Sequence, residues 1–199
     1  MKVIINEKKV IYQGFLTLEK CRLQHELFNG EMSEVIVREN CFRGDSVAAL
    51  VYDLPNDKII LIRQFRYPVY ASEPQNDWLW EIPAGSCLPP ETPVASIIKE
   101  LKEEINLQVD ENSLEFIGGY FVSPGGTSER VFLYGVPFNS TTFRITNGGL
   151  REEGEDIEVR QFSFAALWAK KENSITQDLK TALALQWLKI KKMETETAR

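Results

Sequence analysis

The sequence predicts an α/β protein with an additional β segment at its N-terminus. Short runs rich in β-branched residues, separated by polar stretches, indicate strands in the first forty residues and again on both sides of a central helix. That helix, 93–105, has apolar residues at helical spacing, and a second helical pattern covers 178–191. Strands combined with amphipathic helices bury their apolar residues when the helices cover a sheet.

The first 44 residues read as a small β segment. Strand-like runs lie at 3–5, 10–12, 15–18 and 34–39. The sequence Phe-Asn-Gly-Glu at 28–31 is typical of a hairpin turn. Such a segment is too small to bury a core by itself, so we expect it to pack on the main domain or on a second subunit. The resulting boundaries are 1–44 for the N-terminal segment and 45–199 for the main domain.

The main domain reads as a series of strands with one well-marked helix near its middle. Strand patterns lie at 47–52, 58–63, 78–83, 114–122, 130–136 and 157–162. Helical patterns near the C-terminus lie at 164–171 and 178–191. A polar stretch from 139 to 156 is too long for a tight connection, and loops of that length are often functional.

The central helix has a start signal, a stop signal and one apolar face. Thr92 can cap its N-terminus and Pro93 suits its first turn, whereas Asn106 is suited to a left-handed cap at its end. The apolar face consists of Val94, Ile97, Ile98, Leu101 and Ile105. We expect this face to bury against the sheet.

Three carboxylates lie beside that apolar face. Glu100, Glu103 and Glu104 occupy positions i, i+3 and i+4, which are neighbours on a helix. Like charges at these positions repel one another, and a hard divalent cation such as Mg²⁺ would turn the repulsion into a binding site. Taken alone, the three carboxylates are more simply read as a solvated helix face.

A longer pattern around the three carboxylates changes that interpretation. Gly85, Glu91 and the run Lys99-Glu-Leu-Lys-Glu-Glu-Ile-Asn-Leu are spaced as in the Nudix box. This part of the chain therefore resembles the hydrolases that cleave nucleoside diphosphates linked to another group. Two positions depart from the family, since Lys99 stands where arginine is usual and Asn106 where glycine is usual. Lysine keeps the positive charge but loses the planar fork, whereas asparagine suits the same cap.

The resemblance implies the Nudix fold, an α/β/α sandwich with a mixed sheet, and a metal site. Its metal ligands would be the backbone carbonyl of Ala84 together with Glu100 and Glu104. Glu103 would share the metal or serve catalysis by orienting the ligands. The implied cofactor is Mg²⁺, with Mn²⁺ as an alternative.

Three further segments narrow the subfamily. Arg63–Pro68, Ser123–Arg130 and Gly149–Ile157 are similar to segments of the ADP-ribose and nucleoside-diphosphate-sugar pyrophosphatases. The similarity implies four substrate-binding residues, namely Arg43, Arg66, Ser86 and Glu129. Arginine suits a phosphate ligand because its planar fork matches two phosphate oxygens. Surface ion pairs are the alternative role for the two arginines.

The acidic loop at 152–156 is the second carboxylate cluster. The similarity places the catalytic base at Glu153 and a metal or water contact at Glu155, with Glu152 as the alternative base. A carboxylate on a loop can approach and accept a proton from water once substrate is bound. A solvated acidic loop is the plainer alternative.

The resemblance implies Mg²⁺-dependent hydrolysis of the pyrophosphate bond of ADP-ribose or a related nucleoside diphosphate sugar. The products would be a nucleoside monophosphate and a sugar phosphate. A GDP-mannose-type pyrophosphatase shares every motif, and a sensor that binds ADP-ribose-like ligands without cleaving them is a further alternative. In the related enzymes the N-terminal segment helps to form a homodimer, so we expect a homodimer here.

Composition and charge argue against several other classes. The net charge of −6 and a sequence pI near 5.0 disfavour a protein that binds nucleic-acid backbones. No run approaches the roughly 18 apolar residues of a membrane span, so we expect no membrane partner and a cytoplasmic location. One histidine and three cysteines without a paired spacing predict neither a His-based metal cluster nor a disulfide framework.

Overall fold

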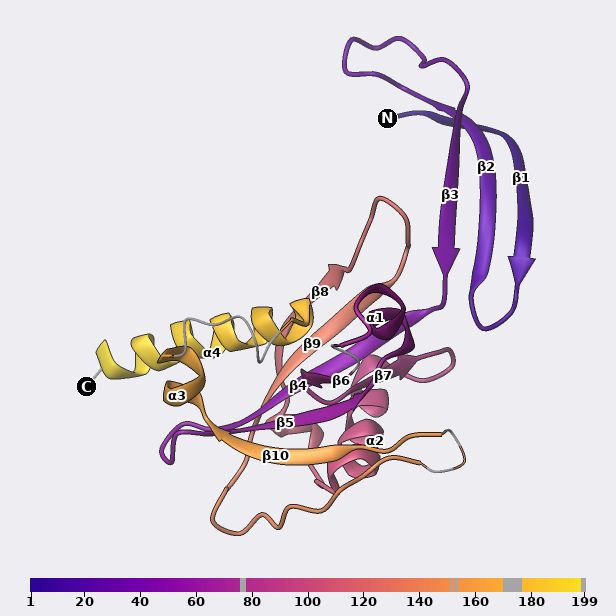
Figure 1. Cartoon of the computed structure of the whole chain (residues 1–199). Coiled ribbons are helices and arrows are strands. Elements are labelled where there is room, and N and C mark those ends of the chain that lie inside the picture. The colour runs from indigo at the N-terminus through magenta and orange to yellow at the C-terminus, as the bar shows by residue number, and fades with distance from the viewer. Residues whose placement is uncertain (76–77, 151, 153, 170–176, 198–199) are drawn as a thin grey trace. The chain divides into compact units, whose positions relative to one another are not determined.

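A seven-stranded mixed sheet organises the larger of two units in this chain (Figure 1). The computed structural model describes residues 1–75, 78–150, 152, 154–169 and 177–197. The larger unit consists of Ser46–Tyr120 and Val131–Arg199, and the smaller one consists of Met1–Asp45 and Phe121–Arg130.

The sheet of the larger unit combines parallel and antiparallel pairs. Its strands are β4 (Asp45–Asp53), β5 (Lys58–Phe65), β6 (Trp78–Glu81), β7 (Ala84–Cys87), β8 (Glu115–Phe121), β9 (Arg130–Pro137) and β10 (Glu158–Ser163). The strand order is β10-β5-β4-β9-β8, with β6 paired to β5 and β7 paired to β4. β4 and β9 are parallel, whereas β5 is antiparallel to β4, β6 and β10. The predicted mixed sheet is therefore confirmed.

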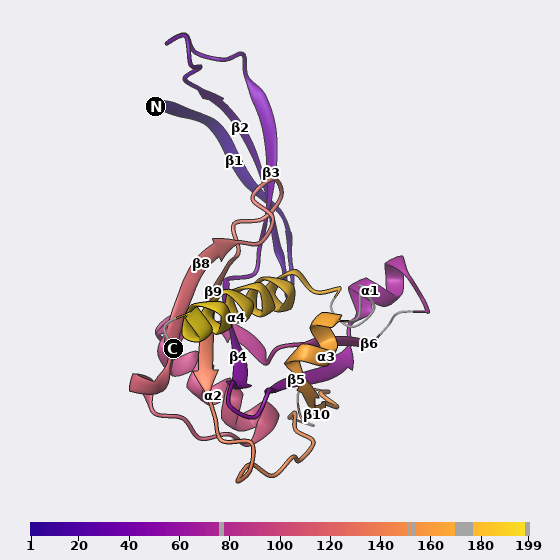
Figure 2. The ribbon, with the colours of Figure 1, turned by 90° about the vertical axis from the view of Figure 1, so that its left-hand side faces the viewer.

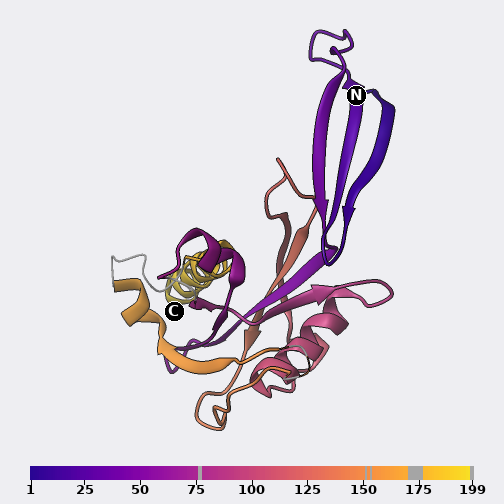
Figure 3. The same cartoon turned by 45° about the vertical axis from the view of Figure 1, so that its right-hand side comes forward.

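Helices cover both faces of this sheet (Figures 1 and 3). On one face, α2 (Pro93–Ile105) packs its apolar side, including Ile97 and Leu101, against alternate buried residues of β4. On the other face lies α4 (Leu179–Thr197), whose Trp187 ring packs edge-on against Tyr52 and lies where a side chain at Gly135 would be. Because β4 is covered on both faces, seven of its nine residues are buried. This arrangement is the predicted α/β/α sandwich.

The caps of α2 are those that the sequence predicts. The Thr92 hydroxyl oxygen accepts a hydrogen bond from the Ala95 N–H at 3.2 Å, and Pro93 begins the helix. At the other end Asn106 adopts the left-handed conformation, with φ 53° and ψ 35°. Its N–H donates to the carbonyl of Lys102, which closes the last turn.

Several element boundaries differ from those predicted. β1 (Val3–Gln13) is one strand and not two, because register shifts against β2 absorb its polar middle. The strand predicted at 78–83 ends earlier, at Glu81, and a further strand that was not predicted, β7, begins at Ala84. α4 extends to Thr197 instead of ending at 191. Two short helices, α1 (Tyr67–Ser72) and the 3₁₀ helix Glu111–Ser113, were not predicted. α3 covers Phe164–Ala169, and the predicted continuation through 170 and 171 lies outside the described residues.

The smaller unit contains an antiparallel three-stranded sheet (Figure 2). It is formed by β1, β2 (Thr17–His25) and β3 (Ile36–Phe42), with β2 in the centre. The predicted turn at 28–31 is confirmed, since Gly30 has a φ of 88° and its N–H donates to the Leu27 carbonyl. Among residues 1–44 only Ser33 and Gly44 are buried, so this sheet encloses no apolar core of its own. No helix of the described residues is both long and apolar enough to cross a membrane.

The left-handed cap at Asn106 generates a stability prediction. A β-branched residue is strained in this conformation, whereas glycine is not, so we expect Asn106→Val to lower the free energy of unfolding by about 1–2 kcal/mol. Asn106→Gly should leave it within about 0.5 kcal/mol. Urea denaturation followed by circular dichroism measures both variants. Equal stability of the two variants would contradict the role given to this residue.

Candidate active site

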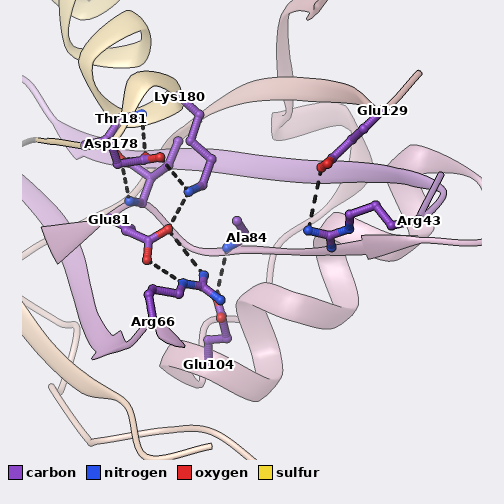
Figure 4. A network of polar contacts seen from close by, with 10 residues as sticks. Arg43, Arg66, Glu81, Ala84, Glu104, Glu129, Asp178, Lys180 and Thr181 are labelled. Atoms are coloured by element: carbon purple, nitrogen blue, oxygen red, sulfur yellow. Dashed lines mark hydrogen bonds and ion pairs between the residues drawn. The ribbon is translucent and has the colours of Figure 1, made fainter. Parts of the chain in front are cut away.

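A buried carboxylate on α2 lies at the centre of the candidate site. Glu104 is only 2 % exposed, and its Oε2 accepts a hydrogen bond from the Ala84 N–H at 2.9 Å (Figure 4). Because α2 buries its apolar face, the positions beside that face pass close under β7. The contact fixes the last turn of the helix against the start of β7.

Glu100 lies one turn before Glu104 and reaches the same part of β7. A Cβ built on Gly85 would come within 1.9 Å of its Oε1 atom, so the carboxyl group occupies the space that a side chain at position 85 would need. Glycine is therefore suited to this position because a side chain would collide with Glu100, and not because the backbone has a positive φ. Ala84 and Gly85 each face one carboxylate of the helix.

The electrostatics of Glu104 reflect this crowding of acidic groups. Burial raises the pKa of its carboxyl group well above the usual range, and the nearby charges of Glu100 and Glu155 raise it further. The hydrogen bond from Ala84 and the positive charge of Arg66 act in the opposite direction. A cation at this place would relieve the excess of negative charge.

Glu103 faces a different environment from its two neighbours. Its carboxylate lies 4.0 Å from the Nζ of Lys99, one turn earlier on the helix, and both side chains are partly exposed. Its backbone carbonyl accepts a weak hydrogen bond from the Gly149 N–H at 3.4 Å. Lys99 therefore pairs with the glutamate that the resemblance associates with orientation of the ligands.

A loop that begins at Gly148 closes over the C-terminal end of α2. A Cβ at Gly148 would lie 1.8 Å from the Glu104 carbonyl oxygen, so only glycine allows this approach. Paired hydrogen bonds between Gly148 and Ile157 close the base of the loop. Inside it, the Leu150 N–H donates to Glu155 Oε2 at 3.1 Å. Glu155 is thereby held where its charge acts on Glu104.

The two base candidates lie on this same loop. Glu152 is described and exposed. Glu153, the predicted base, lies outside the described residues. The structure therefore places the loop beside α2 but describes only one of the two candidates.

A second buried carboxylate, Glu81 at the end of β6, holds Arg66. Its two oxygens accept hydrogen bonds from the Arg66 Nε at 2.7 Å and Nη2 at 3.2 Å (Figure 4). The predicted substrate-binding arginine is thus in a forked ion pair with a side chain that is 3 % exposed. Burial alone would raise the pKa of Glu81, but Lys180 and Arg66 bring it below the usual range.

The N-terminus of α4 joins this network, which the sequence interpretation missed. Lys180 binds Glu81 and also lies 3.0 Å from Asp178. Asp178 caps the helix by accepting a hydrogen bond from the Thr181 N–H. The Thr181 hydroxyl in turn accepts the N–H of Ile82, next to Glu81. The cap could have been found from sequence, because Asp178 stands directly before a helical pattern. No sequence signal, however, indicates that Lys180 binds Glu81 of β6, which lies 99 residues earlier in the chain.

The remaining predicted substrate contacts lie in two places. In the smaller unit the structure brings Arg43 and Glu129 together, with 3.7 Å between guanidinium nitrogen and carboxylate oxygen. Ser86 lies exposed on β7 next to Gly85, in the larger unit.

A cavity of 670 Å³ lies elsewhere in the larger unit, between the β4–β5 turn and the end of α4. Its lysines are engaged, since Lys191 binds Glu115 and Lys192 lies 3.6 Å from Asp57. It holds none of the carboxylates predicted to act, so we place the candidate site at α2 and β7.

The donors around Glu104 suit a hard divalent cation. Carboxylate and carbonyl oxygens are the ligands that Mg²⁺ prefers. In the described part of the chain, no three His, Cys, Asp or Glu side chains form a complete ligand set. Mg²⁺ commonly binds through one or two carboxylates plus substrate phosphates, so the pair Glu100 and Glu104 with a nearby backbone carbonyl fits this ion.

Comparison with known proteins decides the family. The family model described as the NUDIX domain matches residues 43–183, well over half of the chain. The chain belongs to the Nudix family. It is an enzyme, a Nudix pyrophosphatase. The ADP-ribose pyrophosphatase of Escherichia coli (strain K12) is 32% identical over 188 residues, which cover 94% of this chain and 88% of that protein.

Two further matches agree with this assignment. The GDP-mannose pyrophosphatase of Cronobacter sakazakii is 28% identical over 191 residues, covering 96% of this chain and 97% of that protein. A solved structure described as an ADP compounds hydrolase superposes with a TM-score of 0.67 at 20% identity, covering 96% of each chain. That likeness confirms the predicted Nudix fold.

The contact between Gly85 and Glu100 generates a prediction for metal binding. In Gly85→Ala the three atoms nearest to the new methyl group all belong to the flexible Glu100 carboxylate, which must move, so we expect Mn²⁺ affinity to fall by about 10–100-fold. The melting temperature should stay within about 2 °C, because no buried apolar contact is lost. Mn²⁺ titration followed by electron paramagnetic resonance measures the affinity.

Gly126→Ala is the matched control for this experiment. A Cβ at Gly126 would meet nothing within 4 Å, so this variant should bind Mn²⁺ as the wild type does. Unchanged affinity in Gly85→Ala would show that the carboxylate of Glu100 takes no part in holding the ion.

Proposed function

We propose that this Nudix pyrophosphatase hydrolyses the pyrophosphate bond of ADP-ribose or a related nucleoside diphosphate sugar in the presence of Mg²⁺. The products are a nucleoside monophosphate and a sugar phosphate. The observation that carries the proposal is the buried Glu104, which shares its site with Glu100 and the loop carboxylate Glu155. The similarity to ADP-ribose pyrophosphatases over almost the whole chain supports the choice of substrate class.

The metal would be held by the backbone carbonyl of Ala84 with Glu100 and Glu104, and Glu103 and Glu155 would assist. When bound, such an ion neutralises charge on the diphosphate and lowers the pKa of a bound water. The chain itself contributes a dry, acidic surface and fixed backbone positions at β7. Mn²⁺ satisfies the same oxygen ligands and is the alternative ion.

The substrate phosphates and ribose would be bound by Arg66, Arg43, Ser86 and Glu129. The guanidinium of Arg66 suits a diphosphate because its forked donors, which here bind the Glu81 carboxylate, match phosphate oxygens as well. The resemblance assigns the catalytic base to Glu153, on the loop that packs against α2. Glu152 is the alternative base.

A GDP-mannose-type substrate is the second candidate. The 28% identity with a GDP-mannose pyrophosphatase over 96% of this chain favours it as the next substrate to test. The metal site is indifferent to base and sugar, because its ligands act on the diphosphate. We do not propose the non-catalytic sensor, since the family assignment is to hydrolases.

A substrate panel tests the proposal directly. ADP-ribose, GDP-mannose and other nucleoside diphosphate sugars are incubated with enzyme and Mg²⁺, and phosphate is measured after coupling to a phosphatase. We expect the highest kcat/KM for ADP-ribose or a close analogue, and a loss of several orders of magnitude in Glu104→Gln. Turnover of Glu104→Gln within threefold of the wild type would overturn the proposed site, and a panel without any cleavage would overturn the proposed substrate class.

Glu153 generates a separate prediction. A base acts on the proton and not on binding, so Glu153→Gln should lower kcat by about 10²–10⁴ while KM changes little. Raising the pH should partly rescue this variant, because hydroxide can replace the missing base. The same pH change should not rescue Glu104→Gln, whose defect is a lost metal ligand. Glu152→Gln is the matched control and should keep the kcat of the wild type. If kcat instead falls in Glu152→Gln and recovers at high pH, Glu152 is the base and Glu153 is not.

We also propose that the N-terminal segment, 1–44, forms a homodimer interface. Every residue of β1 is exposed in the single chain, including Val3, Ile5 and Tyr12, and β1 is one of the two edge strands of its sheet. An exposed apolar edge strand pairs with other chains unless it is covered. A three-stranded sheet without a buried apolar side chain also needs a partner for stability. A second copy offers the same strand.

Light scattering after gel filtration tests the dimer. The wild type should elute with the mass of two chains, and Ile5→Glu should shift the population toward one chain, because a charge replaces an apolar contact. Glu7→Gln on the same strand should remain a dimer. A wild type that is monomeric at micromolar concentrations contradicts the proposed interface.

A further inference from the structure

Glu81 carries one negative charge and binds two cations. Arg66 approaches it from the end of β5, and Lys180 approaches it from the N-terminus of α4 (Figure 4). Lys180 also binds a second carboxylate, Asp178, so the four side chains carry two positive and two negative charges. The two cations therefore differ not in charge but in how each of them is held.

The two cations differ in how firmly they are held. The Arg66 side chain is 37 % exposed and donates its hydrogen bonds to Glu81, while the charges of Glu104 and Asp178 also act on it. The Lys180 side chain is 19 % exposed and is also bound by Asp178, which itself caps α4. Arg66 can thus turn toward solvent, whereas Lys180 is fixed to the helix terminus.

The charge on Glu81 makes the departure of Arg66 costly unless another cation stays behind. A carboxylate that is 3 % exposed loses most of its hydration, and leaving it without a partner is strongly unfavourable. The charge of Lys180 lowers the pKa of Glu81, as do the hydrogen bond and the charge of Arg66. With Lys180 in place, Glu81 keeps a partner whichever way Arg66 points.

We propose that Lys180 is a positioning residue that retains the charge of Glu81 while Arg66 turns from Glu81 to the diphosphate of the substrate. The inference rests on the proposed function, in which Arg66 binds phosphate. Arg66 exchanges one anionic partner, Glu81, for another, the diphosphate. Lys180 lowers the free energy of the state in which Arg66 has left Glu81. Lys180 acts through Arg66 and does not touch the reacting atoms.

This role affects substrate binding more than the chemical step. Without Lys180, Arg66 becomes the only partner of Glu81 and is held there, so substrate must compete with a buried carboxylate for the guanidinium. KM and the dissociation constant should rise, while kcat changes less. Without Glu81, the carboxylate that holds Arg66 is gone, and Lys180 loses its influence on binding.

The test compares Lys180→Met with Lys180→Arg and with Lys192→Met, a lysine of the same helix that pairs with Asp57. Steady-state kinetics use the best substrate of the panel with Mg²⁺. Calorimetry measures ADP-ribose binding in a metal chelator, which reports on Arg66 independently of turnover. We expect Lys180→Met to raise KM and the dissociation constant by roughly tenfold or more with kcat within about threefold. Lys180→Arg and Lys192→Met should resemble the wild type.

A double-variant cycle separates this role from a structural one. In a Glu81→Gln background, adding Lys180→Met should not weaken binding further, because no buried charge needs the lysine. If Lys180→Met does not fold, Lys180→Gln takes its place with the same expected result. Unchanged KM in the variant without the lysine charge, or an equal loss of affinity with and without Glu81, would overturn the inference. A wild type that cleaves nothing in the panel overturns the proposed function and this inference with it.

Discussion

The balance of buried negative charge is the constraint on which the site of this Nudix enzyme depends. Glu81 and Glu104 are both almost completely buried, and burial raises the pKa of each. The chain compensates Glu81 with two cations, which bring its pKa below the usual range. It surrounds Glu104 with further carboxylates, which push its pKa higher. One buried charge is thus paired by the protein itself, and we propose that a bound cation pairs with the other.

Both carboxylates are associated with one short backbone segment, since Glu81 belongs to it and Glu104 is hydrogen-bonded to it. This segment, 81–84, joins β6 to β7. α4 contacts it twice, since Lys180 binds Glu81 and the Thr181 hydroxyl accepts the Ile82 N–H. α2 contacts it through Glu104, which accepts the Ala84 N–H. Backbone positions at this stretch are therefore fixed from one side by α4 and from the other by α2. The proposed carbonyl ligand of Ala84 thus belongs to a backbone segment that is held from two sides, which suits a ligand that must not move during turnover.

Features that depend on residues close together in the sequence could be predicted, whereas contacts between distant segments could not. The caps of α2 at Thr92 and Asn106 and the spacing of its glutamates are local, so sequence was sufficient for them. The close approach of Gly148 to Glu104 and the bond from Lys180 to Glu81 join segments far apart in sequence, and no periodicity encodes them. α1 was missed for a different reason, since its six residues are too few to show a helical repeat. The resemblance supplied the remaining site residues, which physical reasoning on a single sequence would not have found.

The network around Glu81 is hard to explain as a source of stability. Replacing a buried ion pair by packed apolar residues is often neutral or stabilising, because desolvation offsets most of the attraction. A structure selected for stability alone would have little reason to place Arg66, Glu81 and Lys180 together. The same three residues are well suited to a site that must bind an anion reversibly. An arginine held by a carboxylate is kept in place before substrate arrives, and a second cation lets it leave without exposing a bare charge in the interior. If Arg66 binds phosphate as proposed, the cost in stability is the cost of keeping this group in place before substrate arrives and free to leave Glu81 afterwards.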